Sequence, residues 1–308
     1  MKLCRLTPET ITLSSLISAC REGGQWPTAL ALLGGMAVAR VAPNCISFNA
    51  AVSACETSGQ WRAALGLLQG MAASGVEKDT VAFNAAASAC EKAGQWPAAL
   101  GLLHGMKCRG VARTTISYGA SISACEKSEH WSWALWLFAD MTSHRVAADT
   151  VLCNAVISAC EKGQQWQPAV SVLHGMAAKS IRKDTVTCNA ALSACGTSGQ
   201  WILAVDLLDE MAAARLEKNT ITCNAAAGAF EKGGQWLATL QLLREMAAAE
   251  MQRDALTHSA AISVLSKDPS QRPVTLALLG DMAGDWLGRM RARRSLTQKA
   301  DSWSIDIG

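Results

Sequence analysis

Tryptophan and methionine each recur at intervals of 35 residues along most of this 308-residue chain. The tryptophans are Trp26, Trp61, Trp96, Trp131, Trp166, Trp201 and Trp236, and the methionines are Met36, Met71, Met106, Met141, Met176, Met211 and Met246. Two rare residue types do not keep step seven times by chance, so the chain is an array of internal repeats. Arrays of this kind form stacks in which each unit packs on its neighbours.

The pattern inside one repeat predicts two helices. In the second repeat one apolar stripe has the helical spacing i, i+3, i+4, i+7, and it consists of Phe48, Ala51, Val52 and Cys55. A turn at Ser58-Gly59 follows, because glycine favours the end of a helix. A second helix begins near Trp61 and has its own apolar stripe, formed by Ala64, Leu65, Leu67, Leu68 and Met71.

Neither helix can bury its stripe alone, so the predicted fold is all-α, an α-solenoid superhelix of antiparallel helix pairs. We expect an N-terminal lead-in at residues 1–9 and seven repeats at residues 10–254. A degenerate eighth repeat or cap follows at residues 255–288, where Gln271 replaces the tryptophan and the phase slips before Met282. Residues 289–308 form a basic tail that contains Arg289, Arg291, Arg293 and Arg294.

Composition excludes several classes of protein. Half of the residues are apolar and only 17% are charged, which is unlike a disordered chain. The twelve cysteines contain no C-x-x-C pair, and those at 20, 55, 90, 125, 160 and 195 repeat one position, as copies of a small buried side chain would. So many unpaired cysteines suggest a reducing compartment. No apolar run reaches the length of a membrane span, and the net charge of +3 neither demands nor excludes nucleic acid.

The repeat resembles the pentatricopeptide repeat family over roughly residues 10 to 282. Segments such as DTVAFNAAASACEKAGQWPAALGLLHGM carry the resemblance, with a V-x-[FYC]-N helix start, a GQW turn and a closing methionine. Tetratricopeptide repeats differ in both period and pattern. The resemblance implies binding of single-stranded RNA, one base per repeat. It also implies an organellar location, the plastid ahead of the mitochondrion, although no targeting segment is visible in this chain.

An aliphatic residue stands second in every repeat. The set is Ile11, Ile46, Val81, Ile116, Val151, Val186, Ile221 and Leu256. On a concave face these side chains would let a flat base stack between successive repeats, and the resemblance implies that role. The alternative is that they only join one repeat to the next.

The fifth and last residues of each repeat vary while tryptophan and methionine stay fixed. The resemblance implies that these base-recognition pairs choose the base, and they are Ser14 with Asn44, Asn49 with Asp79, Asn84 with Thr114, Gly119 with Asp149, Asn154 with Asp184, Asn189 with Asn219, and Asn224 with Asp254. By analogy with the family, Asn with Asp implies uracil, and Asn with Asn or Thr implies a pyrimidine, with cytosine as the candidate. Ser with Asn implies adenine, and Gly with Asp, a departure from the usual Thr or Ser, implies guanine. The expected site is A-U-Y-G-U-Y-U, and the alternative is helix capping, for which Asn and Asp are favoured.

Lysines recur at the end of the predicted first helices, at Lys92, Lys127, Lys162, Lys232 and Lys267. Such a line of charges can follow a phosphate backbone. Thr57 and Thr197 interrupt the line, and a solvated helix end that favours cations is the alternative.

No catalytic motif is evident. The histidines at 104, 130, 144, 174 and 258 form neither a zinc-protease nor a deaminase pattern, and no phosphate-binding P-loop occurs. We therefore expect a monomeric, non-catalytic adaptor with no cofactor, no metal and no membrane contact, whose partners are single-stranded RNA and a separate RNA-processing enzyme. A protein-binding scaffold that uses the same face is the rival hypothesis, and a fragment of a longer enzyme is the third.

Overall fold

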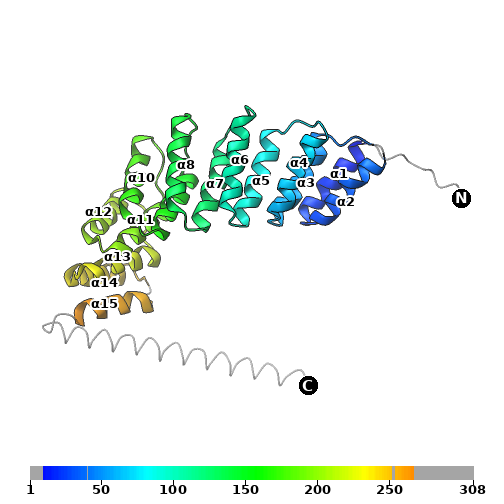
Figure 1. The fold of residues 1–308 in the computed structure, drawn as a ribbon. Coiled ribbons are helices and arrows are strands. Elements are labelled where there is room, and N and C mark those ends of the chain that lie inside the picture. The colour runs from blue at the N-terminus through cyan, green and yellow to red at the C-terminus, as the bar shows by residue number, and fades with distance from the viewer. Residues whose placement is uncertain (1–9, 40, 252–253, 267–308) are drawn as a thin grey trace, which may run out of the picture. The chain divides into compact units, whose positions relative to one another are not determined.

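The computed structural model describes residues 10–39, 41–251 and 254–266, and all regular secondary structure in this part is α-helical (Figure 1). The contacts divide the chain between Lys183 and Asp184 into two units. The first unit contains α1 (Thr10–Glu22), α2 (Trp26–Val38), α3 (Cys45–Thr57), α4 (Trp61–Ala73), α5 (Thr80–Lys92), α6 (Trp96–Cys108), α7 (Thr115–Lys127), α8 (Trp131–Ser143), α9 (Thr150–Lys162) and α10 (Trp166–Ala178). The second contains α11 (Thr185–Ser198), α12 (Trp201–Ala213), α13 (Thr220–Gly233), α14 (Trp236–Ala248) and α15 (Ala255–Ser266).

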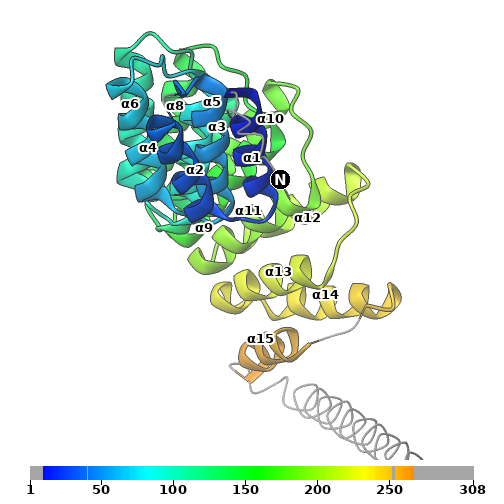
Figure 2. The same ribbon diagram turned by 90° about the vertical axis from the view of Figure 1, so that its right-hand side faces the viewer.

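The predicted all-α repeat fold is confirmed, and the helices follow the 35-residue phase. In the first unit the odd-numbered helices pack each on the next, from α1 to α9, and form one layer (Figures 1 and 2). Each even-numbered helix packs on the first helix of its own repeat, and α2, α4, α6 and α8 also contact the first helix of the following one. The same arrangement holds in the second unit from α11 to α15. The division into a lead-in, seven repeats, a cap and a tail stays a prediction, and residues 267–308 lie outside the described residues.

The two helices of a repeat begin differently. Side chains cap the first helices, as at α5, where Asp79 has extended backbone angles and accepts a 2.8 Å hydrogen bond from the N–H of Ala82. Each second helix begins at the tryptophan of its repeat. No side-chain hydrogen bond caps α6, for example, and a proline stands in its first turn. The turn between the helices uses a left-handed residue such as Gly59, with φ of 63°.

The repeated apolar positions form the core. Every methionine of the 35-residue series is at most 1% exposed, and Cys55, Cys90, Cys125, Cys160 and Cys195 are fully buried. The tryptophans are half-buried. Cys20 is half-buried as well and departs from the predicted core position, because among the described helices α1 has a neighbouring first helix on one side only. Packing therefore accounts for the methionine and cysteine series.

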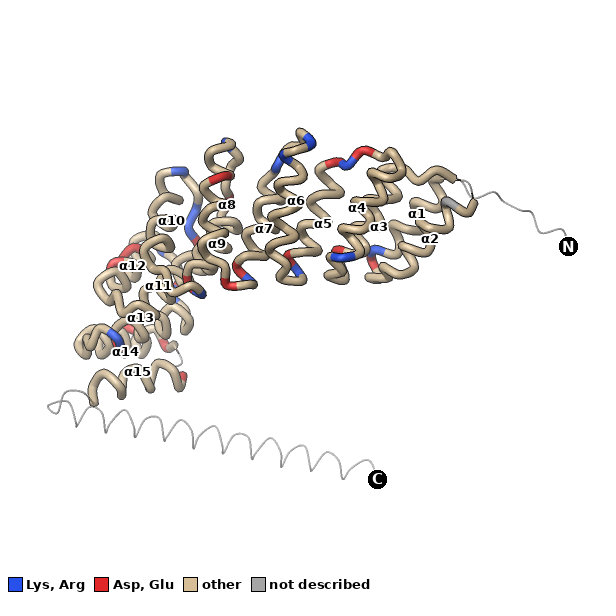
Figure 3. Tube along the Cα trace, in the orientation of Figure 1, with Lys and Arg blue, Asp and Glu red and all other residues tan. Residues whose placement is uncertain are grey.

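Charged residues gather at helix ends and in the links between helices (Figure 3). Within the described part of the chain, no helix combines the length and the apolar character that crossing a bilayer requires.

Candidate nucleic-acid interface

The second residue of each repeat is exposed, and we call this set the aliphatic ledge. Its exposed fractions run from 56% at Val81 to 76% at Val151. The eight members are Ile11, Ile46, Val81, Ile116 and Val151 in the first unit and Val186, Ile221 and Leu256 in the second. More than half of each side chain stays in water, so packing between repeats does not explain why these residues are large and apolar. Exposed apolar residues in a regular series are typical of a binding surface.

Four base-recognition pairs are brought into contact within the units. The amide nitrogen Nδ2 of Asn49 donates to Asp79 Oδ2 at 2.8 Å, and that of Asn224 donates to Asp254 Oδ2 at 2.7 Å. The corresponding distances are 3.3 Å from Asn189 to Asn219 Oδ1 and 3.4 Å from Asn84 to Thr114 Oγ1. The two residues of each of these pairs, 30 positions apart, therefore present their polar groups together.

Of the other three pairs, one has its two members in different units. Asn154 lies in the first unit and Asp184 caps a helix of the second. Gly119 has no side chain, and a Cβ atom there would meet nothing within 4 Å. Ser14 is buried, and its hydroxyl has no hydrogen-bond partner.

The last residue of a repeat is also a helix cap. The side chains of Asn44, Asp79, Thr114, Asp149, Asp184 and Asn219 all accept a hydrogen bond from the third backbone N–H of the following first helix. Capping is therefore confirmed for this position. It does not exclude base recognition, because Asp79 uses Oδ1 for the cap and Oδ2 for Asn49.

Hydrogen bonds keep two of these carboxyl groups ionised. Burial alone would raise the pKa of Asp79, but bonds from the Ala82 N–H, the Cys45 thiol and Asn49 outweigh it, and the pKa is lowered from 3.8. The pKa of Asp254 is lowered in the same way, against burial, by bonds from the Thr257 and Leu256 N–H groups, the Thr257 hydroxyl and Asn224. An ionised carboxylate only accepts hydrogen bonds, so it turns the nitrogen of the neighbouring amide toward itself.

Unpartnered buried polar atoms occur at the fifth position of the first three repeats. Among the described residues, the buried side-chain oxygens without a hydrogen bond are Ser14 Oγ, Asn49 Oδ1 and Asn84 Oδ1. Buried polar groups are almost always hydrogen-bonded, so such exceptions point to a functional position. All three were predicted base-recognition residues.

Comparison with known protein families agrees with this geometry. The sequence profile of the pentatricopeptide repeat domain matches residues 171–232, and that of the PPR repeat matches residues 46–76 and 81–111. The chain is a pentatricopeptide repeat protein. None of the curated proteins matches its sequence.

Solved structures share the pentatricopeptide repeat fold. The maize pentatricopeptide repeat protein PPR10 is 20% identical and superposes with a TM-score of 0.56, over 84% of this chain and 42% of PPR10. The chain thus spans less than half of the length of PPR10. The PPR domain of Arabidopsis thaliana protein-only RNase P 1, solved in complex with tRNA, is 15% identical with a TM-score of 0.51, over 57% of this chain and 92% of that domain.

Three of the five lysines predicted to bind phosphate contact the preceding repeat. Lys127 pairs with Glu91 of the preceding repeat at 3.1 Å, and Lys162 pairs with Glu126 at 3.2 Å. Lys232 donates to the carbonyl oxygen of Thr197 at 2.6 Å. Lys267 lies outside the described residues. Phosphate binding by these lysines stays a prediction, and the paired glutamates weaken the positive field that it needs.

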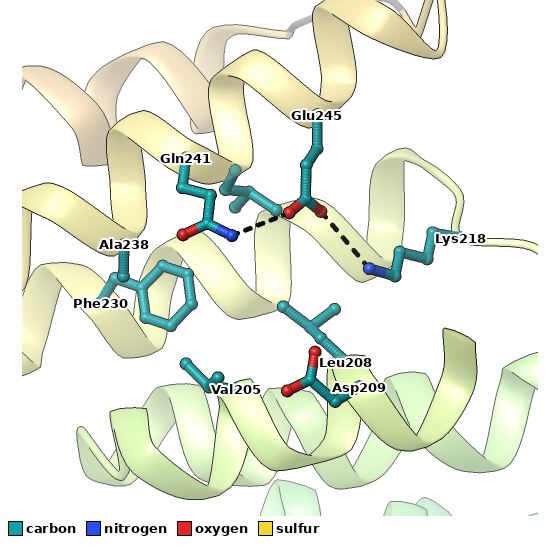
Figure 4. Close-up of a pocket in the computed structure, with 9 residues that line it drawn as sticks. Val205, Leu208, Asp209, Lys218, Phe230, Ala238, Gln241 and Glu245 are labelled. Atoms are coloured by element: carbon teal, nitrogen blue, oxygen red, sulfur yellow. Dashed lines mark hydrogen bonds and ion pairs between the residues drawn. The ribbon is translucent and has the colours of Figure 1, made fainter. Parts of the chain in front are cut away.

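A small cavity in the second unit is lined by none of the ledge residues. It is lined mainly by α12 and α14, and Lys218 and Gln241 both contact Glu245 at its rim (Figure 4). Its volume is about 60 Å³, enough for a few water molecules. We assign it no part in the interface.

The sequence analysis missed the third residue of each repeat. Thr222 and Thr257 are fully buried and contact the base-recognition asparagines of the preceding repeats. A usable signal was present, since six of the eight third residues carry a hydroxyl group: Thr12, Ser47, Ser117, Thr187, Thr222 and Thr257.

Proposed function

We propose that this pentatricopeptide repeat protein binds single-stranded RNA selectively, with one nucleotide opposite each repeat. The observation that carries the proposal is the aliphatic ledge, which stays exposed in phase with the polar base-recognition pairs. A base is flat and apolar on its faces and polar along its edge. A surface that alternates exposed aliphatic side chains with paired amides matches both properties.

In the proposed complex each base lies between the ledge residues of successive repeats, such as Val186 and Ile221. Its Watson–Crick edge meets the amide of the base-recognition pair. An asparagine offers two N–H donors and a carbonyl acceptor, and in the Asn–Asp pairs the aspartate uses one donor. The second N–H is left for an acceptor such as a pyrimidine oxygen.

The proposed site is A-U-Y-G-U-Y-U, from repeat one to repeat seven. The protein would act as an organellar adaptor that shields this RNA or positions a separate processing enzyme, with no reaction of its own. The RNase P repeat domain that shares the fold was solved with tRNA, which supports an RNA partner.

The test compares substitutions on the ledge with matched substitutions elsewhere. Val186 and Ile202 are 60% and 59% exposed, and Ile221 and Leu237 are 62% and 64% exposed, but Ile202 and Leu237 lie on second helices. We expect Val186→Glu and Ile221→Glu each to weaken binding of an A-U-Y-G-U-Y-U oligonucleotide by about tenfold or more, since each replaces an apolar contact to a base with a carboxylate that repels the phosphates. Ile202→Glu and Leu237→Glu should leave it within about twofold.

Binding is measured by fluorescence anisotropy at fixed salt, with duplex RNA and a scrambled single strand as competitors. Equal losses for ledge and control variants, or no preference for the proposed strand over the scrambled one, would refute the proposal. Replacement of Lys92, Lys127 and Lys162 by glutamine separates the rival scaffold function, because it removes the charges without placing a carboxylate against Glu91 or Glu126. Binding of a protein partner should survive it, and RNA binding should weaken.

A further inference from the structure

Two threonines contact base-recognition amides from the following repeat. Thr222 Oγ1 lies 2.6 Å from Asn189 Oδ1, and Thr257 Oγ1 lies 3.0 Å from Asn224 Oδ1. Each threonine is the third residue of its repeat and is fully buried. The hydroxyl donates toward an amide oxygen whose nitrogen is already bonded to the last residue of the repeat. Both ends of the Asn189 amide are therefore held, whereas Thr257 also lies 2.8 Å from Asp254 Oδ1, which shares its one hydrogen with Asn224.

The first three repeats lack this contact. In the repeats that follow them, the third residues are Ser47, Ala82 and Ser117. The buried side-chain oxygens of the fifth residues in these first three repeats have no hydrogen-bond partner. Ala82 has no donor to offer. The serine hydroxyls donate instead to the carbonyl oxygens of their own helix caps, Asn44 at 2.9 Å and Thr114 at 2.8 Å.

Serine and threonine also differ sterically at this place. The γ-methyl group of threonine restricts its χ1 rotamers, whereas serine is freer to turn its hydroxyl back to the helix cap. At Thr222 the same hydroxyl lies 2.9 Å from Asn219 Oδ1, so its one hydrogen is shared by the two side chains of one base-recognition pair.

We propose that the third residue of a repeat is a positioning residue for the amide of the preceding repeat, and that threonine there sharpens the choice of nucleotide. The inference rests on the proposed RNA-binding function. A held amide presents its remaining N–H group in one direction. An amide that lacks a donor on its oxygen exchanges its nitrogen and oxygen ends at lower cost, because the oxygen has no hydrogen bond to lose.

The sharpest comparison uses repeats three and six, which are both expected to take a pyrimidine. Asn84 in repeat three has a 3.4 Å contact to Thr114 and an unpartnered oxygen, whereas Asn189 in repeat six has both ends bonded. The substitutions Ser117→Thr and Thr222→Ser exchange one methyl group in each direction. Both keep a hydroxyl for the capping box that these residues form.

The readout is the ratio of affinities for RNAs that carry a pyrimidine or a purine opposite one repeat. Thr222→Ser should lower this ratio at repeat six by about fivefold, and Ser117→Thr should raise it at repeat three by about fivefold, as the gain or loss of one hydrogen bond implies. Ratios opposite the other repeats serve as internal controls and should not change. A purely structural effect would weaken all the RNAs equally, and that result, or unchanged ratios, would overturn the inference.

A measurement on the free protein separates this inference from the proposed function. If the wild-type protein binds no RNA, the proposed function fails, but the orientation of the amides can still be measured by NMR. We expect the side-chain amide of Asn189 to be more ordered than that of Asn84, and Thr222→Ser to release it. Equal order in the two asparagines, or no effect of the substitution, contradicts the positioning role.

Discussion

Asp79 both caps a helix and contacts Asn49, so substitutions there can separate stability from base recognition. Asp79→Ala removes the 2.8 Å cap bond from the Ala82 N–H and the 2.8 Å bond from Asn49. Loss of a cap costs roughly 1 kcal/mol, and loss of a hydrogen bond to a charged group roughly 1.5–3 kcal/mol. We therefore expect the free energy of unfolding to fall by about 2–4 kcal/mol.

Asp79→Asn should behave differently, because asparagine also caps helices well. It reproduces the Asn–Asn pair of repeat six, where Asn189 and Asn219 remain in contact at 3.3 Å. We expect a loss of less than about 1 kcal/mol. In RNA binding, the nucleotide preferred opposite repeat two should shift from uridine toward cytidine.

Asp149→Ala is the matched control. Asp149 accepts the same cap bond at 2.8 Å from the N–H of Leu152, but its partner at the fifth position is Gly119, which has no side chain. Its loss should be about 1 kcal/mol, the cap alone. The assays are urea denaturation and competition between U- and C-containing RNAs. The reasoning fails if Asp79→Asn costs as much stability as Asp79→Ala, or if the U-to-C ratio opposite repeat two does not move.

Three further predictions concern the glycines and the buried cysteines. A Cβ atom at Gly233 would lie 2.6 Å from Trp201 Cδ1, whereas one at Gly228 of the same helix would meet nothing within 4 Å. Gly233→Ala should therefore lower the urea midpoint, by overpacking worth ~1–3 kcal/mol, and Gly228→Ala should not lower it. A Cβ atom at Gly119 would also meet nothing within 4 Å. In Gly119→Asn, selection from randomised RNA should show the purine preference opposite repeat four replaced by a preference for uridine. An unchanged preference would contradict base recognition at this repeat. Burial raises the pKa of Cys55, Cys90, Cys125 and Cys195 to about 11 and that of Cys160 to about 12, from 9.0. Thiols in the unfolded chain ionise at lower pH than the buried ones, so the stability present below pH 9 should be lost as the pH rises through about 11. Urea denaturation at pH 8 and pH 10.5 checks this. Equal urea midpoints at the two pH values would contradict it.

The fold followed from the sequence because its evidence is periodic and local. The tryptophan and methionine series set the phase, and helical spacing within one repeat was enough to predict both helices. The ledge was also visible, since its residues are aliphatic at a place that the apolar stripe does not need. Side-chain contacts between repeats were harder to predict from the sequence. The pairing of Lys127 with Glu91 joins residues 36 positions apart, and no spacing within a helix suggests it.

The role of the third residue could not be predicted for a similar reason. Whether Thr222 contacts Asn189 depends on a rotamer and on a neighbour 33 residues earlier in the chain. Sequence alone shows a hydroxyl near the start of a helix, which capping explains. Serine and threonine appear equivalent in that pattern, and they differ only when the packing of the preceding repeat is known.

If the last residue of a repeat also chooses the base, as proposed, its capping role limits how such an array can change its RNA target. Asn44, Asp79 and Thr114 all cap a helix, so these side chains are interchangeable with respect to folding. A repeat can thus exchange one for another at little cost in stability, and under the proposed function it would acquire a new base preference. Residues outside the capping set would change the RNA and weaken the helix together. The helix that follows therefore restricts the residue types allowed at this position to those that cap it. Under the proposed function, a single repeat could change its base preference only by exchanging one such residue for another.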